Sequence, residues 1–214
     1  MDFYTQLIKQ PAEPLVMGIL NLTPDSFYDG GRYTQHNEIM NRIKNMISEG
    51  VNIIDIGVFS SRPGANLISL KEEENRLFPT LLKIRELFPD IIISIDTYRY
   101  QIAEQAIKYG ANMINDIYVE KDQSNMFKVI QKHNVPYILM HMSGEPENMQ
   151  KNITYVHFQN DILKYFNSKI KILREMQFEK IIIDPGFGFG KTLSHNYQLI
   201  NMIPEIMKIG FPIL

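Results

Sequence analysis

The sequence has no cysteine among its 214 residues, which excludes disulfide bonds, thiolate nucleophiles and zinc sites built on cysteine. It also lacks an apolar run of the roughly 18 residues that a transmembrane helix needs. Residues 1–14 are polar and contain no apolar core of the secretory kind, so a cytoplasmic location is expected. The formal net charge is only −2, which gives no indication of a basic surface for nucleic acid.

The composition is that of a globular protein with a substantial core. Hydrophobic residues make up 44% of the chain and charged residues 21%. The length favours one domain over residues 1–214. Neither a low-complexity segment nor a linker interrupts the chain.

Short apolar, β-branched runs recur along the chain and predict strands. Several are apolar throughout rather than alternating, which is typical of strands covered on both faces in a parallel sheet. The seven predicted strands span residues 15–20, 52–56, 91–95, 113–115, 137–140, 180–184 and 211–214.

Six amphipathic stretches between these runs predict helices. Ser69 and Glu72 form a plausible capping box, and Pro79 is expected to split or kink the helix that follows. The apolar stripes and stop signals place the helices around residues 39–47, 69–87, 102–107, 124–132, 155–176 and 195–202.

Connections from helix to strand are short, whereas those from strand to helix are long and polar. A TIM barrel and a doubly wound sheet both bind ligands on such loops, at the carboxyl ends of the strands. The strand number favours the α/β class with a TIM (β/α)8 barrel. Because a barrel has eight strands and eight helices, seven predicted strands and six predicted helices indicate an incomplete one, lacking the end of strand seven, strand eight and the last helices.

Six consecutive predicted strands end in polar or polarisable side chains. Each one alone could simply cap a helix or make a turn. In a parallel barrel, however, the ends converge on one pocket, where carboxylates and amides would bind the N–H edge of a flat heterocycle such as a purine, pterin or flavin. These strand-end residues are Asn21, Asp55, Asp96, Asn115 with Asp116, Met140 with His141, and Asp184.

Two of the polar loops suit a phosphate group. Residues 60–64 combine hydroxyls, the Arg62 guanidinium and Gly64, which allows close backbone approach. Residues 21–26 are polar and rich in turn formers. Oxygen ligands of this kind suit Mg²⁺ shared with a substrate phosphate, although both loops could also be ordinary polar loops.

The segment 186–192 is rich in glycine but is not a phosphate-binding P-loop. The motif requires glycine where this chain has Pro185, and the dinucleotide fingerprint has a different spacing. We interpret the segment as a flexible loop over the pocket mouth, with Phe189 available for stacking and Lys191 for an anion. The five histidines show no metal-ligand spacing, and we expect neither a ligand nor a base role for His141.

In these motifs the chain resembles the dihydropteroate synthases, pterin-binding enzymes of the folate pathway. The resemblance covers residues 15–200 in the order of the family. It is carried by residues 17–27 with 29–31, 55–57 with 60–64, 94–98, 114–117, 139–142 and 183–186 running on to 192.

The resemblance implies a TIM barrel that joins 4-aminobenzoate to 6-hydroxymethyl-7,8-dihydropterin diphosphate, giving 7,8-dihydropteroate and diphosphate. It implies catalytic roles for Asp96, Asp184 and Arg62, with Mg²⁺ as cofactor. By position, Asp96, Asn115, Met140 and Asp184 would bind the pterin, Ser61 and Arg62 the diphosphate, Asn21 the Mg²⁺, and Thr23, Pro24, Asp25, Ser26, Phe27, Pro63, Gly64, Phe189 and Lys191 would form the 4-aminobenzoate site and its loops.

The partners implied are these small molecules, with neither nucleic acid nor membrane, and homodimers are common in the family. The family is also the target of sulfonamide-type mimics of 4-aminobenzoate. One departure is that residues 58–61 read Val-Phe-Ser-Ser where the family often has Gly-Glu-Ser-Thr. Another is that the family has a Ser-Arg-Lys group and an Arg-x-His group beyond the position of Leu214, so weak or absent activity is expected of the 214 residues.

Three alternatives stay open at this stage. One is a pterin-binding methyltransferase acting between methyltetrahydrofolate and a corrinoid, which would not need a diphosphate loop. Another is a non-catalytic pterin-binding fragment. The last is a structural barrel whose loop residues only cap helices.

Overall fold

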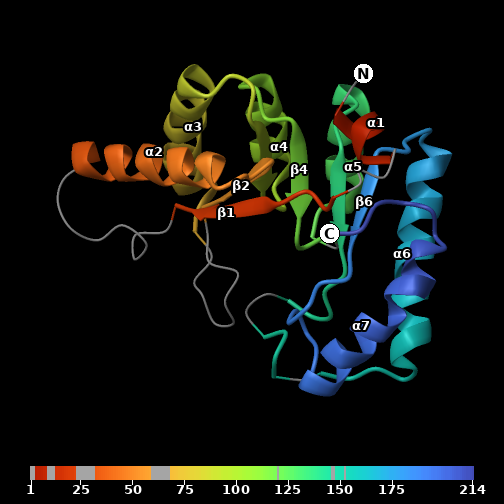
Figure 1. Cartoon of the computed structure of the whole chain (residues 1–214). Coiled ribbons are helices and arrows are strands. Elements are labelled where there is room, and N and C mark those ends of the chain that lie inside the picture. The colour runs from red at the N-terminus through yellow and green to blue at the C-terminus, as the bar shows by residue number, and fades with distance from the viewer. Residues whose placement is uncertain are drawn as a thin grey trace.

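The computed structural model describes residues 3–8, 13–22, 32–58, 68–119, 121–145, 148–151 and 153–214. Strands and helices alternate along these residues (Figure 1). The elements are α1 (Phe3–Ile8), β1 (Met17–Asn21), α2 (Arg32–Ser48), β2 (Ile53–Gly57), α3 (Leu70–Leu87), β3 (Ile92–Asp96), α4 (Tyr100–Lys108), β4 (Met113–Asp116), α5 (Gln123–His133), β5 (Tyr137–Met140), α6 (Phe158–Glu175), β6 (Ile181–Asp184) and α7 (Leu193–Met207).

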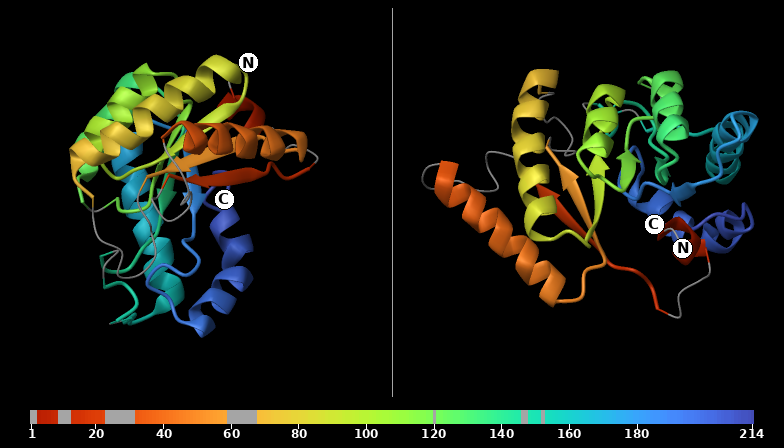
Figure 2. Two further views of the ribbon diagram at one scale, coloured as in Figure 1. Left: turned by 90° about the vertical axis from the view of Figure 1, so that its left-hand side faces the viewer. Right: turned by 90° about the horizontal axis from the view of Figure 1, so that it is seen from above.

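The strands form one parallel sheet in the order β1-β2-β3-β4-β5-β6. Helices α2 to α7 lie as an outer arc around the strands (Figure 2). Sequential order without a reversal is that of a barrel, because a doubly wound sheet reverses its strand order at the switch point. The structure therefore confirms the predicted α/β class and argues against the doubly wound alternative.

Two predictions of element number were wrong. Residues 211–214, predicted as a seventh strand, form only an isolated parallel bridge between Ile183 and Ile213, so the described sheet has six strands. In addition, α1 was not predicted, which gives seven helices in the described residues. A helix of six residues is too short for an apolar stripe to recur, which is why the sequence pattern did not reveal it.

Helix α3 passes through Pro79 as one helix and is not split. The Thr80 hydroxyl, next to this proline, donates to the Arg76 carbonyl at 3.1 Å. The predicted start is confirmed, because the Ser69 hydroxyl accepts from the Glu72 amide at 3.1 Å. The other predicted helices are α2 and α4 to α7, but α2 begins seven residues before the predicted start at 39 and α7 ends five residues after the predicted end at 202.

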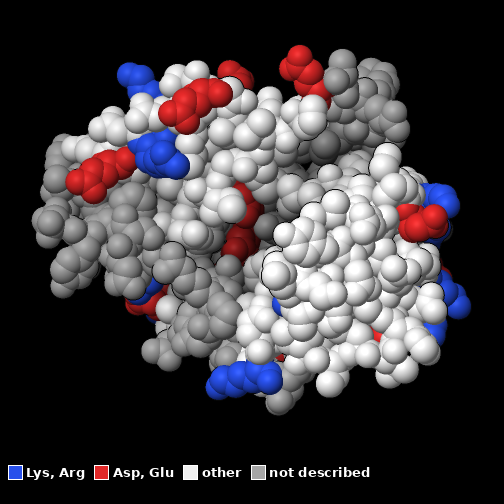
Figure 3. Space-filling view, turned by 60° about the horizontal axis from the view of Figure 1, so that its bottom comes forward, with Lys and Arg blue, Asp and Glu red and all other residues white. Residues whose placement is uncertain are grey.

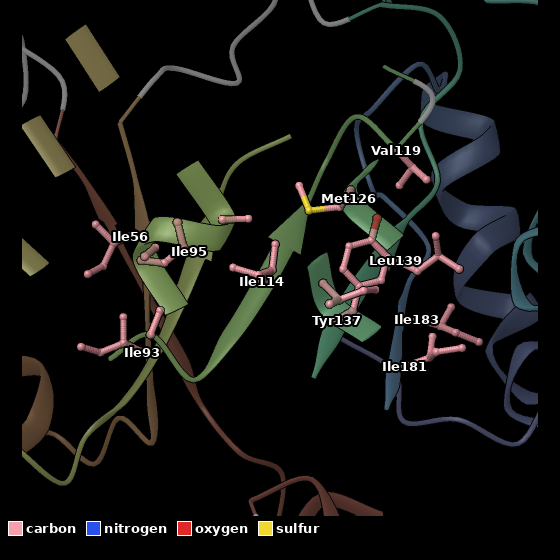
Figure 4. Close-up of a cluster of buried hydrophobic side chains, with 14 of the residues drawn as sticks. Ile56, Ile93, Ile95, Ile114, Val119, Met126, Tyr137, Leu139, Ile181 and Ile183 are labelled. Carbon is pink, nitrogen blue, oxygen red and sulfur yellow. The ribbon is translucent and has the colours of Figure 1, made fainter. Parts of the chain in front are cut away.

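Successive residues of each strand point to opposite faces of the sheet, and the two sets of side chains belong to two separate cores. Residues that point outward, among them Ile93, Ile95 and Leu139, pack beneath α2 to α7 (Figure 4). Residues at the amino ends that point inward, such as Ile53 and Ile182, form a smaller cluster inside the sheet with Tyr4 of α1. Helix α1 therefore closes the interior at the end opposite the loops that follow the strands.

The described residues include no helix that is long and apolar enough to cross a membrane. This agrees with the sequence, which has no apolar run of that length.

Candidate active site

The inward-facing residues at the carboxyl ends of the strands are polar. The register pairs Asp55 of β2 with Ser94 of β3, and Asp96 of β3 with Asn115 of β4. Neighbours in a parallel register point to the same side of the sheet, so these residues line one interior surface. On the side where the loops after the strands lie, acidic atoms are visible inside a central hollow (Figure 3). The predicted convergence of strand ends is present in the fold.

Asn21 and Asp96 lie on either side of Gly57. A Cβ atom built on Gly57 would lie 3.1 Å from Asn21 Oδ1 and 3.2 Å from Asp96 Oδ2, so a larger residue here would crowd both oxygens. Glycine at this position therefore keeps open the space between the ends of β1 and β3.

Four buried polar atoms of this interior surface have no hydrogen-bond partner among the described residues. They are Asp55 Oδ1, Ser94 Oγ, Asp96 Oδ1 and Asn115 Oδ1, and the last two belong to the residues paired nearer the mouth. The amide nitrogen of Asn115, by contrast, donates to Asp55 Oδ2 at 3.1 Å. Because an unpaired buried acceptor is costly, these atoms indicate a site completed by a ligand that brings N–H groups.

The carboxyl groups of the site are shifted toward their protonated forms. Burial is the main cause that raises the pKa of Asp96 well above its ordinary value, and the charges of Asp55, Asp116 and Glu73 add to it. Burial also raises the pKa of Asp184 to about 6, against the hydrogen bond from the Gly186 amide. A ligand that carries positive charge or N–H donors would relieve this cost and favour the ionised carboxylates.

Met140 lies in a cluster of polarisable and aromatic side chains beside the carboxylates. The buried members are Met140, Met142, Met149, Tyr98 and Ile117, and the half-buried Phe189 packs against them. Such a cluster offers an apolar wall for a flat ring. The structure thus brings Met140 and Phe189 into one cluster, as expected if both contact a ligand.

Lys191 does not lie at the mouth, contrary to the predicted anion site. It is only 3% exposed, and its ammonium donates to the carbonyls of His141, Gly186 and Phe189 at 2.8–3.0 Å. Its Nζ also lies 3.0 Å from His141 Nδ1. In this position Lys191 joins the loop after β6 to the end of β5 and does not present a charge to a substrate. Sequence reasoning missed this because the partners are mainly backbone carbonyls.

Asp116 also ends a strand but does not face the pocket. Its carboxylate accepts from the Tyr137 hydroxyl and the Tyr118 amide, each at 2.9 Å. Asp116 therefore has a structural role and does not belong to the ligand-binding residues.

Sequence reasoning missed a buried ion pair behind Asp96. Glu73 of α3 is fully buried, pairs with Arg99 and accepts from the Thr97 hydroxyl at 2.7 Å. The signal was present, because Glu73 lies on the same stripe of α3 as the buried Leu77 and Ile84. A carboxylate on an apolar stripe predicts a buried partner.

Several predicted site residues lie outside the described part of the chain. The two loops concerned are those after β1 and β2. These residues are Thr23, Pro24, Asp25, Ser26, Phe27, Ser61, Arg62, Pro63 and Gly64.

The described donors suit an Mg²⁺ ion that takes most of its ligands from water and substrate phosphate. Asn21 is exposed at the end of β1 and offers an amide oxygen toward the mouth. The described residues contain no group of three or more His, Asp or Glu side chains that could enclose a metal. Mg²⁺ commonly binds through one or two protein oxygens together with water and substrate phosphate, and Asn21 suits that mode.

Comparison with known proteins gives a consistent result. Residues 17–214 match the profile of the family described as pterin binding enzyme. The dihydropteroate synthase of Clostridium beijerinckii is 44% identical over 201 residues, which are 93% of this chain and 72% of the relative.

Solved structures agree with this relationship. The dihydropteroate synthase of Yersinia pestis in a sulfonamide drug complex has a TM-score of 0.84 and 38% identity, covering 94% of this chain and 73% of the other. The Xanthomonas albilineans enzyme with 4-aminobenzoic acid has a TM-score of 0.84 and 31% identity, over 94% and 72%. A TIM barrel with inward-facing carboxylates at its mouth thus coincides with extensive similarity in sequence, and the chain belongs to the pterin-binding enzymes and, among them, to the dihydropteroate synthase family.

Proposed function

We propose that this chain binds 6-hydroxymethyl-7,8-dihydropterin diphosphate and transfers its pterin-methyl group to 4-aminobenzoate. The observation that carries this proposal is the pair of buried acceptors without donors, Asp96 Oδ1 and Asn115 Oδ1, at the mouth of a pterin-binding fold. A pterin presents several N–H groups along one edge and would satisfy them. The similar Xanthomonas albilineans enzyme, solved with 4-aminobenzoic acid, supports the second substrate.

In this proposal Asp96, Asn115 and Asp184 hold the pterin edge, and Met140 packs on the ring. The bond between the methylene carbon and the diphosphate oxygen breaks, and its electron pair leaves with the diphosphate. The 4-aminobenzoate nitrogen then forms a bond to that carbon and loses one proton to solvent. Ionised Asp96 and Asp184 would stabilise the positive charge that develops on the pterin.

The leaving diphosphate needs positive charge of its own. Arg62 and the Ser61 hydroxyl are the proposed contacts, through hydrogen bonds that a guanidinium makes readily to phosphate oxygens. Mg²⁺, held by Asn21, would neutralise charge on the diphosphate when bound. We also propose that the protein is cytoplasmic and forms a homodimer, and sedimentation velocity would test the dimer.

Pterin binding tests the proposal most directly. We expect Asp96→Asn and Asp184→Asn each to weaken binding of 6-hydroxymethylpterin by about 30- to 100-fold, because each removes a charge-assisted hydrogen bond. The control is Asp90→Asn, which changes an exposed aspartate away from the site. Isothermal titration calorimetry measures all four proteins. Unchanged affinity in both site variants would contradict the proposal and favour a structural barrel whose strand-end and loop residues only cap helices.

Product formation then separates the remaining alternatives. Diphosphate release that requires 4-aminobenzoate supports the transferase, and it should disappear in Arg62→Ala. Tight pterin binding without such release would favour a non-catalytic pterin-binding protein. Methyl transfer from methyltetrahydrofolate to a corrinoid would favour the methyltransferase alternative.

A further inference from the structure

Asp55 is a buried carboxylate that the proposed reaction does not use. It lies on β2, two residues before Gly57, and its side chain points into the interior of the sheet. Only 6% of its surface is exposed. In the register it stands opposite Ser94, one inward-facing position further from the mouth than Asp96. Asp55 therefore lies beneath the residues that contact a ligand.

The contact between Asp55 and Asn115 decides how the amide of Asn115 is turned. Asn115 Nδ2 donates to Asp55 Oδ2 at 3.1 Å, and the reverse orientation would place two acceptor oxygens together. Asn115 is itself only 6% exposed, so solvent offers little alternative. Its Oδ1 is left without a donor among the described residues.

We propose that Asp55 is a positioning residue for the pterin, which holds the Asn115 amide in the one orientation that leaves Oδ1 to accept an N–H of the ring. The inference rests on the proposed function and deepens it. Asp55 does not touch the ligand, so its effect passes through Asn115. A site with its acceptor already oriented loses less entropy on binding than one in which the amide can turn.

The charge of Asp55 also reaches the other two carboxylates of the site. Its charge is one of the causes that raise the pKa of Asp96 and the pKa of Asp184. Replacing Asp55 by asparagine removes this charge but keeps an oxygen that can accept from Asn115. Replacing it by leucine removes both. Comparison of the two variants therefore separates orientation of the amide from repulsion between charges.

The test is a double-mutant cycle in pterin affinity on the full 214-residue chain. We expect Asp55→Leu to weaken binding of 6-hydroxymethylpterin about tenfold, and Asp55→Asn by less than about threefold. In an Asn115→Ala background, Asp55→Leu should have no further effect. The control is Thr80→Val, which removes a buried hydroxyl of α3 away from the site and should leave affinity unchanged.

A spectroscopic readout covers the case in which Asp55→Leu does not fold. One side-chain amide proton of Asn115 should exchange slowly in the wild type and in Asp55→Asn, as measured by nitrogen-15 NMR. Equal losses of affinity from Asp55→Leu with and without Asn115, or rapid exchange of both amide protons in the wild type, would overturn the inference. Failure of the wild type to bind pterin would instead overturn the proposed function, before any variant is compared.

Discussion

Lys191 and Asp116 are both buried, and loss of water moves their pKa values in opposite directions. Burial lowers the pKa of the Lys191 ammonium to about 7 and raises the pKa of the Asp116 carboxyl to about 7. The sequence placed Asp96, Asn115 and Asp184 at the ends of predicted strands, where they could face one pocket, and the register shows that they point inward. The burial of Lys191 could not be predicted, since backbone carbonyls leave no trace in residue types.

Replacing Lys191 by methionine should remove the link between the loop after β6 and the end of β5. We expect Lys191→Met to lower the free energy of unfolding by about 2–4 kcal/mol at pH 7, because buried carbonyls lose their donor. The wild type should gain stability as the pH rises from about 7 toward about 10, since the unfolded chain keeps the lysine proton longer. Urea unfolding at several pH values measures both effects.

The control for this experiment is Lys171→Met, which changes an exposed lysine. It should leave both the stability at pH 7 and its increase with pH in place. A stability of Lys191→Met equal to that of the wild type would contradict the role given to the buried ammonium.

Asp116 should titrate far from its ordinary range. Carbon-13 NMR of the carboxyl group should give a midpoint near pH 7, the value that burial imposes. Between about pH 4 and about pH 7 the folded state holds a proton that the unfolded chain has released, so this group makes stability fall as the pH rises. A midpoint below pH 5 would contradict the prediction.

At the scale of elements, the loop after β6 packs directly against the loop after β5. Gly186 and Gly190 have φ angles of +68° and +62°, and a Cβ on them would lie 2.1 Å from the His141 carbonyl and 2.3 Å from the Ser143 carbonyl. Periodicity predicted six of the helices and the six paired strands. It could not predict this contact between loops, which depends on tertiary approach.

The glycines of this loop provide a matched pair of substitutions. Gly190→Ala should lower the free energy of unfolding by about 3 kcal/mol or more, because its backbone must move away from Ser143. Gly188→Ala should cost only about 1 kcal/mol, because φ is +82° but the space beside it is open. Chemical unfolding of both variants measures the difference, and equal losses would mean that the loops are not in contact.

At the scale of the whole molecule, Tyr4 connects the first helix to the last paired strand. Its hydroxyl shares its one proton between the carbonyls of Glu179 and Ile181, at 2.8 and 2.9 Å, and accepts from the Ile181 amide at 3.1 Å. Its ring packs in the cluster that fills the amino-terminal end of the interior. The sequence marked this region only as polar and not secretory, because the partners of Tyr4 lie far along the chain.

Removing the Tyr4 hydroxyl should therefore act on global stability. We expect Tyr4→Phe to lower the free energy of unfolding by about 1–3 kcal/mol, since the Ile181 amide loses its acceptor and the nearby carbonyls lose the shared hydroxyl proton. Tyr197→Phe is the control, because Tyr197 is exposed on α7. Thermal and urea unfolding should agree. If Tyr4→Phe and the control had the same melting temperature, the hydrogen bonds between α1 and β6 would not stabilise the fold.

The alternation along β3 has a consequence for how the sheet is aligned during folding. Ile93 and Ile95 pack under the helices, while Ser94 and Asp96 face the interior. A slip of one residue in the pairing of β3 would exchange the two sets and bury a carboxylate among isoleucines. Slipped chains are thus penalised by the same side chains that serve the site. The register of β3 that gives a stable sheet is therefore also the register that aligns the binding groups. Correct folding and the ability to bind a ligand both depend on it.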